Sequence, residues 1–141
     1  MSKRQRSVSE LEQIAKEDGR YRVEALLFVL QSLEYLVNNL EEHRHVSGEE
    51  LSDGVREFAQ KCFGLMARTV LAEWGIVKTD DVGKIVYLLI DRGWMNRTEE
   101  DRLEDFFDVF DFTEAFDRDY DIPHVDLPKP NRKWLVWKGG K

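Results

Sequence analysis

Apolar residues repeat with the spacing of an α-helix along most of residues 9–93. The most apolar stretch covers residues 20–42, where a narrow polar stripe contains Glu24, Gln31 and Asn38 at intervals of seven residues. A helix with so narrow a polar face must be covered on most of its sides. The pattern therefore predicts either the central helix of the domain or one half of a subunit interface.

Capping signals and glycines divide this region into separate helices. Ser9 with Glu12, and Ser47 with Glu50, have the spacing of a capping box, so a helix is expected to begin at each serine. Thr79, followed by two aspartates, opens a further helix because acids favour a helix N-terminus. The glycines expected to end or interrupt these helices are Gly19, Gly64, Gly75 and Gly93.

The pattern is ambiguous near residues 94–112. Phe110 and Phe112 alternate with acids, which fits either a helix or a strand and leaves open a small β-hairpin. Helices followed by a hairpin would resemble a winged helix-turn-helix, with residues 79–92 as the recognition helix. Residues 98–105 are strongly acidic, however, and would repel the phosphates of duplex DNA. We therefore expect this surface to bind protein, and duplex DNA is an unlikely partner.

These elements predict a mainly α fold that forms a compact helical domain with one core. The domain would be winged-helix-like if the hairpin forms. Residues 1–19 would hold a basic N-terminus and a short helix, and residues 20–116 the helical core domain. Residues 117–141 would form an extended C-terminal tail, because three prolines oppose regular structure there. The prolines are Pro123, Pro128 and Pro130.

Charge is strongly segregated along the chain. The formal net charge is −7, with 21 Lys and Arg residues against 28 acids. Three of the cations lie in residues 1–6 and five in residues 129–141, and neither segment contains an acid. An acidic body thus has two basic ends, which serve either to bind a partner or only to neutralise the body and keep it soluble.

The sequence also predicts a cytoplasmic location without a membrane span. The longest uncharged apolar run, residues 25–33, is about half the length of a membrane-spanning helix. The basic N-terminus is followed by charged residues in place of an apolar signal-peptide core. Cys62 is the only cysteine and cannot form an internal disulfide, which fits a reducing compartment.

Several short motifs in residues 21–116 resemble a family of small uncharacterised bacterial proteins, a conserved hypothetical family of planctomycete–verrucomicrobial type. The resemblance implies a bacterial cytoplasmic protein, and it implies no activity, cofactor or catalytic residue. The motifs are Tyr21-Arg22-Val23-Glu24-Ala25, His45-Val46-Ser47-Gly48, Glu50-Leu51, Phe63-Gly64, Glu73-Trp74-Gly75-Ile76, Thr98-Glu99-Glu100-Asp101 and Asp111-Phe112-Thr113-Glu114-Ala115-Phe116.

No residue pattern typical of catalysis, of a cofactor or of a metal site is present in the sequence. His43 and His45 are two residues apart, which places their imidazoles on different sides of a helix. The acids of residues 104–111 alternate with aromatic residues, which indicates an amphipathic segment with its rings inward. An enzymatic alternative remains, and its site would comprise Glu104, Asp105, Asp108 and His124.

The C-terminal tail combines cations with two indoles. Cations bind phosphates and indoles stack on unpaired bases, so RNA or the ribosome is one predicted partner. Docking on another protein and docking of both indoles on the chain's own acidic body are the alternatives. The candidate interaction residues are Lys129, Arg132, Lys133, Trp134, Trp137 and Lys138.

The sequence as a whole favours a non-enzymatic interaction module. Its acidic helical body would bind a protein partner or a second copy of the chain, since the apolar helix at residues 20–42 exceeds what a surface helix needs. The alternative is an RNA- or ribosome-associated protein that acts through the basic tail.

Overall fold

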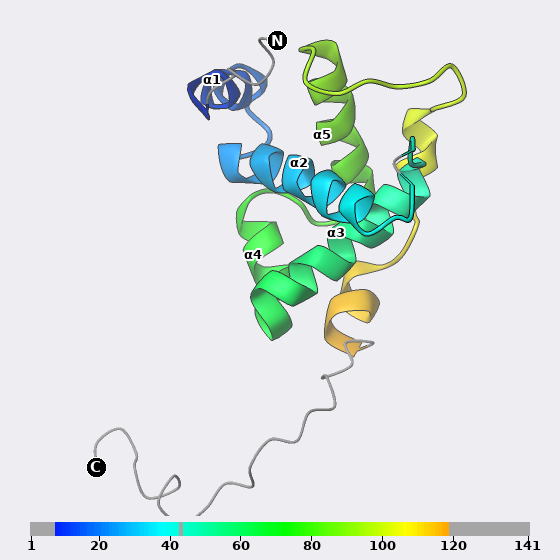
Figure 1. Ribbon diagram of the computed structural model, residues 1–141. Helices are drawn as coiled ribbons and strands as arrows, with labels where there is room; N and C mark the ends of the chain where they lie inside the picture. Colours follow the sequence, from blue (N-terminus) through cyan, green and yellow to red (C-terminus); the bar gives the residue numbers. More distant parts are fainter. Residues whose placement is uncertain (1–7, 43, 119–141) are drawn as a thin grey trace, which may run out of the picture.

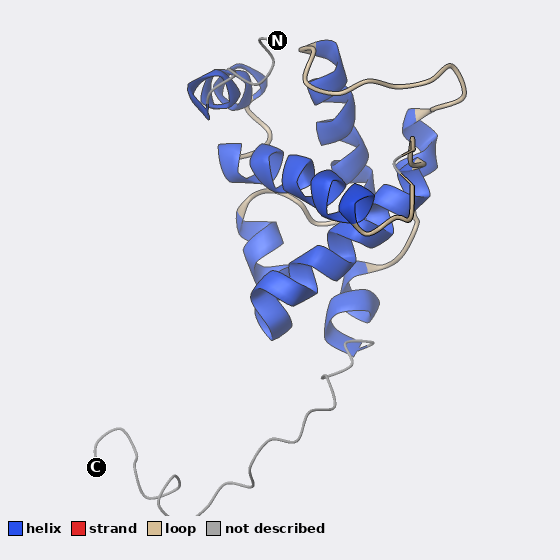
Figure 2. Ribbon diagram, in the orientation of Figure 1, coloured by secondary structure: helices blue, strands red, loops and turns tan. Residues whose placement is uncertain are grey.

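The computed structural model describes residues 8–42 and 44–118, except for the side chains of residues 117 and 118, and these residues are mainly helical. The α-helices are α1 (Val8–Asp18), α2 (Val23–Asn38), α3 (Gly48–Phe63), α4 (Ala67–Glu73) and α5 (Thr79–Asp91) (Figure 1). The shorter turns are the 3₁₀ turns η2 (Gly64–Met66) and η3 (Leu103–Phe106) and the π-helical turn η4 (Thr113–Arg118). The described residues contain no strand, and the predicted mainly α class is confirmed (Figure 2).

Helix α2 lies at the centre of the fold and packs against α1, α3 and α5. Its first half is buried, with Ala25, Leu26 and Val29 fully excluded from solvent. Its second half is less completely covered, since Leu33 and Val37 are only partly buried. The interpretation as the central helix thus holds for its first half, and the subunit interface stays a prediction. Among the described helices, none combines the length and apolarity that crossing a membrane requires.

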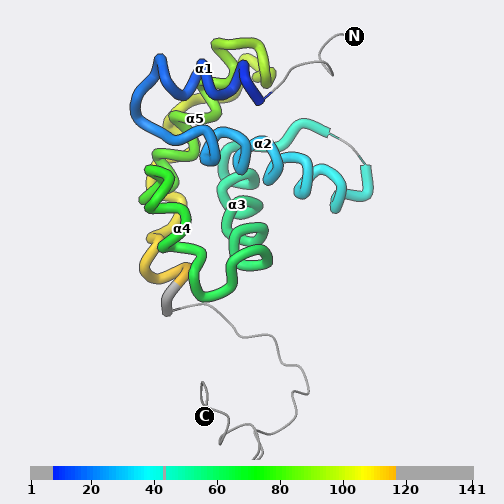
Figure 3. Tube along the Cα trace, turned by 90° about the vertical axis from the view of Figure 1, so that its left-hand side faces the viewer, coloured from blue at the N-terminus to red at the C-terminus, as the bar shows by residue number. Residues whose placement is uncertain are grey.

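Helices α3 and α4 lie side by side below α2 and are joined by η2 (Figure 3). Gly64 has a φ of 57°, which turns the chain at the position where the sequence predicted an interruption. Stacked and tilted rings then connect α2, α3 and the end of α4. The ring contacts are Phe28–Phe58, Phe28–Phe63, Phe28–Trp74 and Phe63–Trp74.

A buried hydrogen bond fixes α5 to the segment that precedes α2. The Tyr21 hydroxyl donates to Asp81 Oδ1 over 2.7 Å. The second carboxylate oxygen of Asp81 accepts from the amides of Val77 and Lys78 over 2.9 and 3.2 Å. Burial, together with the bond to Asp81, raises the pKa of Tyr21. One carboxylate therefore caps the start of α5 and also ties it to a residue 60 positions away.

The hairpin left open by the sequence does not form near residues 94–112, and with it the wing is absent from the described part of the chain. The reason is that α5 satisfies the backbone of this region. Thr79 Oγ1 accepts from the amide of Val109, and Asp80 Oδ1 accepts from the amide of Asp108, both over 3.1 Å. These amides are then unavailable for strand pairing, and the chain turns at Asp108, which has a φ of 55°.

The aromatic ending of the domain packs inward, as the amphipathic interpretation predicted, with one exception. Phe106, Phe112 and Phe116 are buried, whereas Phe107 is 41% exposed. The interleaved acids of residues 104–111 face solvent. The side-chain amide of Gln60 donates to the carbonyl of Ala115 over 3.1 Å and holds η4 against α3.

Candidate functional site

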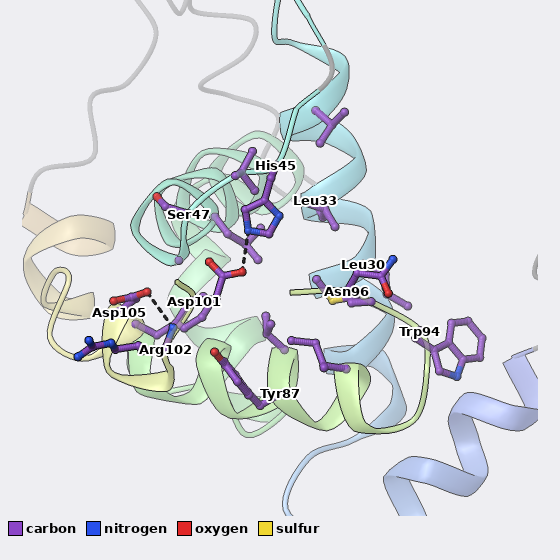
Figure 4. Close-up of a pocket in the computed structure, with 18 of the residues that line it drawn as sticks. Leu30, Leu33, His45, Ser47, Tyr87, Trp94, Asn96, Asp101, Arg102 and Asp105 are labelled. Carbon is purple, nitrogen blue, oxygen red and sulfur yellow. Dashed lines mark hydrogen bonds and ion pairs between the residues drawn. The ribbon is translucent and has the colours of Figure 1, made fainter. Parts of the chain in front are cut away.

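An apolar cavity lies where α2, α3 and α5 meet, and residues 44–47 and 94–106 contribute its other walls (Figure 4). Its volume is about 330 Å³, at the lower end of the range for protein pockets that hold small ligands. The apolar residues that line it are Leu30, Leu33, Val37, Val46, Leu51, Val86, Ile90, Trp94, Met95 and Phe106.

Helical periodicity explains two of the walls. Leu30, Leu33 and Val37 recur at intervals of three and four residues, so they share one face of α2. Val86 and Ile90, four residues apart, share a face of α5 in the same way. Most of these side chains are only partly buried, because they border the cavity and are not fully packed against one another.

Phe106 closes the cavity from the side of η3, and two glycines make room for it. A Cβ atom on Gly83 would lie 2.6 Å from the Cβ of Phe106, and one on Gly48 would lie 3.0 Å from its ring. Only residues without a side chain permit so close an approach. Phe106 is 5% exposed as a result, and η3 is held against both α3 and α5.

A contact between His45 and Asp101 borders one end of the cavity. His45 Nε2 lies 2.7 Å from Asp101 Oδ2, and the same oxygen accepts from the amide of Thr98 over 2.8 Å. This contact joins the loop before α3 to the loop before η3. Figure 4 shows the two side chains facing each other, with Trp94 at the opposite end.

Tyr87 adds a polar atom beside the apolar walls. Its hydroxyl is buried and has no hydrogen-bond partner among the described residues. Burial raises the pKa of Tyr87, and the guanidinium of Arg97 lies 5.6 Å from the centre of its ring. An unpaired buried hydroxyl costs about 1–3 kcal/mol, so an occupant that accepts a hydrogen bond from it would gain affinity.

A shallow acidic hollow adjoins the cavity and shares Arg44, His45, Ser47, Asp101 and Asp105 with it. The residues that line the hollow are Arg44, His45, Ser47, Glu50, Thr98, Glu99, Glu100, Asp101 and Asp105. Arg44 is already paired with Glu50, and the imidazole of His45 contacts Asp101. The carboxylates of Glu99, Glu100 and Asp105 therefore dominate the charge at the border, which favours a positively charged occupant.

Arg44 and Glu50 fix the loop that leads into α3. Arg44 donates two hydrogen bonds to the Glu50 carboxylate, over 2.8 and 3.1 Å. Glu50 also accepts from the amide of Ser47 and donates its own amide to the Ser47 hydroxyl, which confirms the predicted capping box. The Arg44 guanidinium, assisted by the Ser47 amide, lowers the pKa of Glu50 to about 2.

Glu50 is expected to make stability depend on pH under acidic conditions. Because its pKa falls from 4.5 to about 2 on folding, its contribution is complete above about pH 4.5 and is lost as the pH falls through about 2. Thermal unfolding of Glu50→Gln should therefore show a smaller loss of Tm across this window than the wild type. Solvent limits the effect, since the side chain is 42% exposed.

Glu49→Gln is the matched control for this experiment, because Glu49 is the exposed neighbour in the same helical turn. It should retain the pH dependence of the wild type. Identical slopes for Glu50→Gln and the wild type would contradict the role assigned to the Arg44–Glu50 pair.

The interaction residues predicted in the tail lie outside the described residues, as does His124 of the enzymatic alternative. The other members of that alternative, Glu104, Asp105 and Asp108, are exposed, and of these Asp105 lines the cavity. Within residues 8–42 and 44–118, no group of three or more His, Cys, Asp or Glu residues is placed to hold a metal ion.

Sequence reasoning did not find the cavity. It did identify an excess of apolar residues in the helix at residues 20–42. That excess was the available signal for the cavity, because Leu33 and Val37 lie in the half of α2 that is less completely buried. Periodicity shows which side chains share a helix face, but it does not show that the faces of two neighbouring helices leave a gap between them.

No protein-family model matches this chain, and no curated protein or solved structure matches it either. The resemblance of residues 21–116 to a bacterial family therefore stays a prediction.

Proposed function

We propose that this protein is a non-enzymatic interaction module that binds a basic segment of a protein partner. One apolar side chain of that segment enters the cavity, and flanking cations meet the acidic border. The observation that carries the proposal is the apolar cavity of about 330 Å³ beside the carboxylates of Glu99, Glu100 and Asp105.

The apolar walls supply the affinity. Burying one large apolar side chain contributes about 1.5–3 kcal/mol, and such anchors in desolvated pockets dominate binding at protein interfaces. Leu33, Val86 and Phe106 come from three different elements, so the anchor is enclosed from several sides. A single anchor offsets only part of the entropy of association, and we expect weak binding by isolated short peptides.

The acidic border supplies the selectivity. Glu99 and Glu100 are exposed, and each adds negative charge next to the opening of the cavity. Charge complementarity of this kind raises association rates and disfavours partners of like charge. Because the carboxylates are exposed, added salt should weaken the selectivity.

The proposal predicts a preference between two peptides that differ only in the charge beside their anchor. Lys-Lys-Trp-Lys-Lys should bind the full chain at least tenfold more tightly than Glu-Glu-Trp-Glu-Glu, as titration followed by two-dimensional amide NMR would show. The largest shift changes are expected at Met95, Asn96 and Asp101, which lie along the cavity wall. Equal affinity for the two peptides, or shift changes away from the cavity, would refute the proposal.

Two variants separate the cavity from the rest of the surface. Leu33→Trp fills the cavity and should abolish binding of the basic peptide, whereas Leu65→Trp makes the same change at a residue that is 64% exposed on η2 and should leave binding unchanged. Charge reversal by Glu99→Lys with Glu100→Lys alters only exposed residues and should remove the preference between the peptides. This double variant keeps the test valid if Leu33→Trp disturbs packing.

A further inference from the structure

We propose that the segment 133–138 of this chain is itself an occupant of the cavity, so that the module is blocked by its own C-terminal region until a partner displaces it. This inference rests on the proposed function and names the segment that competes for the same site. It is an interaction within one chain.

The segment has the composition that the cavity and its border require. It reads Lys133-Trp134-Leu135-Val136-Trp137-Lys138, with an indole beside each lysine. Residues 129–141 contain no acid. The other basic segment, residues 1–6, contains no aromatic residue and so offers no comparable anchor.

The described residues present complementary chemistry to both parts of this segment. The cavity is lined by apolar side chains of α2, α3 and α5, which suit an indole. Glu99, Glu100 and Asp105 stand at its border, where they meet the flanking lysines. Arg102 also lines the cavity and adds one cation, but these three carboxylates outnumber it, and Arg44 is already paired with Glu50.

The connecting chain is long enough for this contact. The described residues end at Arg118 in η4, which packs against α3 and α4. The residues between Arg118 and Trp134 extend to roughly 50 Å at most, whereas a domain of about 100 residues has a radius of gyration near 13 Å. The extended connection is therefore longer than the direct distance across the domain, and the segment can reach the cavity from η4.

Attachment to the same chain also compensates for weak contacts. A short flexible connection gives an effective concentration in the millimolar range, so a segment that binds weakly as a free peptide still occupies the cavity for much of the time. A partner with a better anchor, or present at a higher local concentration, displaces it.

The test compares two full-length proteins, the wild type and the double variant Trp134→Ala with Trp137→Ala. The probe is a fluorescein-labelled peptide of residues 128–141, followed by fluorescence anisotropy. We expect the double variant to bind the probe at least tenfold more tightly than the wild type, because its own segment no longer competes. The amide signals of Met95, Asn96 and Asp101 should also differ between the two proteins.

The outcomes distinguish this inference from the proposed function. If both proteins bind the probe with equal affinity and still prefer the basic to the acidic pentapeptide, the cavity is functional but is not blocked by its own chain, and the inference is wrong. If neither protein binds any of the peptides, both proposals fail. A mass that rises with concentration in the wild type alone would place the segment on a second copy and would overturn docking within one chain.

Lys133→Ala with Lys138→Ala is the matched charge variant. It keeps both indoles and should strengthen probe binding less than the double tryptophan variant. If an RNA oligonucleotide bound the wild type without altering the signals of Met95 and Asp101, and the tryptophan variant left probe affinity unchanged, the segment would be an RNA contact and not the cavity's occupant.

Discussion

Asp81→Ala is expected to lower the free energy of unfolding by about 3 kcal/mol. Asp81 is 9% exposed and accepts hydrogen bonds from the Tyr21 hydroxyl and from the amides of Val77 and Lys78. Loss of a helix cap costs about 1 kcal/mol, and leaving a buried hydroxyl without a partner costs about 1–3 kcal/mol. Denaturant unfolding followed by circular dichroism would measure the change.

The contribution of the tyrosine can be separated from that of the cap. Tyr21→Phe removes only the hydroxyl and should cost about 1 kcal/mol. In the double variant with Asp81→Ala, the combined loss should be smaller than the sum of the two, because the orphaned hydroxyl is gone. Asp91→Ala, an exposed aspartate in the same helix, is the control and should change stability by less than about 0.5 kcal/mol. Strict additivity of Tyr21→Phe and Asp81→Ala would contradict the contact.

Local signals in the sequence predicted several helix boundaries, although the helix expected over residues 20–42 spans only Val23–Asn38. Ser47 and Glu50 form the capping box that their spacing indicates, and the glycines at 19, 75 and 93 take positive φ values at helix ends. These features depend on residues that are close in sequence. For Asp81, the sequence predicted only a favourable place in the first turn of a helix, since its partner Tyr21 is 60 positions away.

The ambiguity near residues 94–112 was resolved by distant contacts. Alternating Phe110 and Phe112 fits a strand, yet the amides of the neighbouring Asp108 and Val109 donate to the side chains of Asp80 and Thr79, which are 28 and 30 positions away. Tertiary packing thus outweighed the local alternation, as is usual for weak strand signals. Cys62 continues the apolar spacing of α3 in the sequence, yet it is exposed in the fold.

The cavity depends on a fit between elements that no single stretch of sequence displays. Gly48 and Gly83 carry no distinguishing signal in the sequence, although both are required for the approach of Phe106. The acids of residues 98–105 were identified as a surface that repels DNA, but their place beside an apolar opening follows only from the fold. The composition therefore indicated that this surface is acidic, and the packing of α2, α3 and α5 determined that the acids lie beside the cavity.

Gly83→Ala is expected to destabilise the protein by about 3 kcal/mol, although alanine is the better helix former. The substitution gains up to about 1 kcal/mol in helix propensity. The new Cβ would lie 2.6 Å from Phe106 Cβ and 2.7 Å from its Cγ, so Phe106 and η3 must move away from α5. Loss of a buried phenylalanine from its site costs about 3–5 kcal/mol, which exceeds the gain. Denaturant unfolding would measure the difference.

Gly54→Ala provides the matched control, because Gly54 is also buried within a helix. There the nearest atom to a new Cβ is a terminal methyl of Leu36 at 3.3 Å, which can shift, and stability should change by less than about 1 kcal/mol. Movement of η3 in Gly83→Ala would also open one wall of the cavity, so binding of the basic pentapeptide should weaken in that variant and persist in Gly54→Ala. If Gly83→Ala were as stable as the wild type and bound the peptide equally well, the close contact of Phe106 with Gly83 and its role as a cavity wall would both be contradicted.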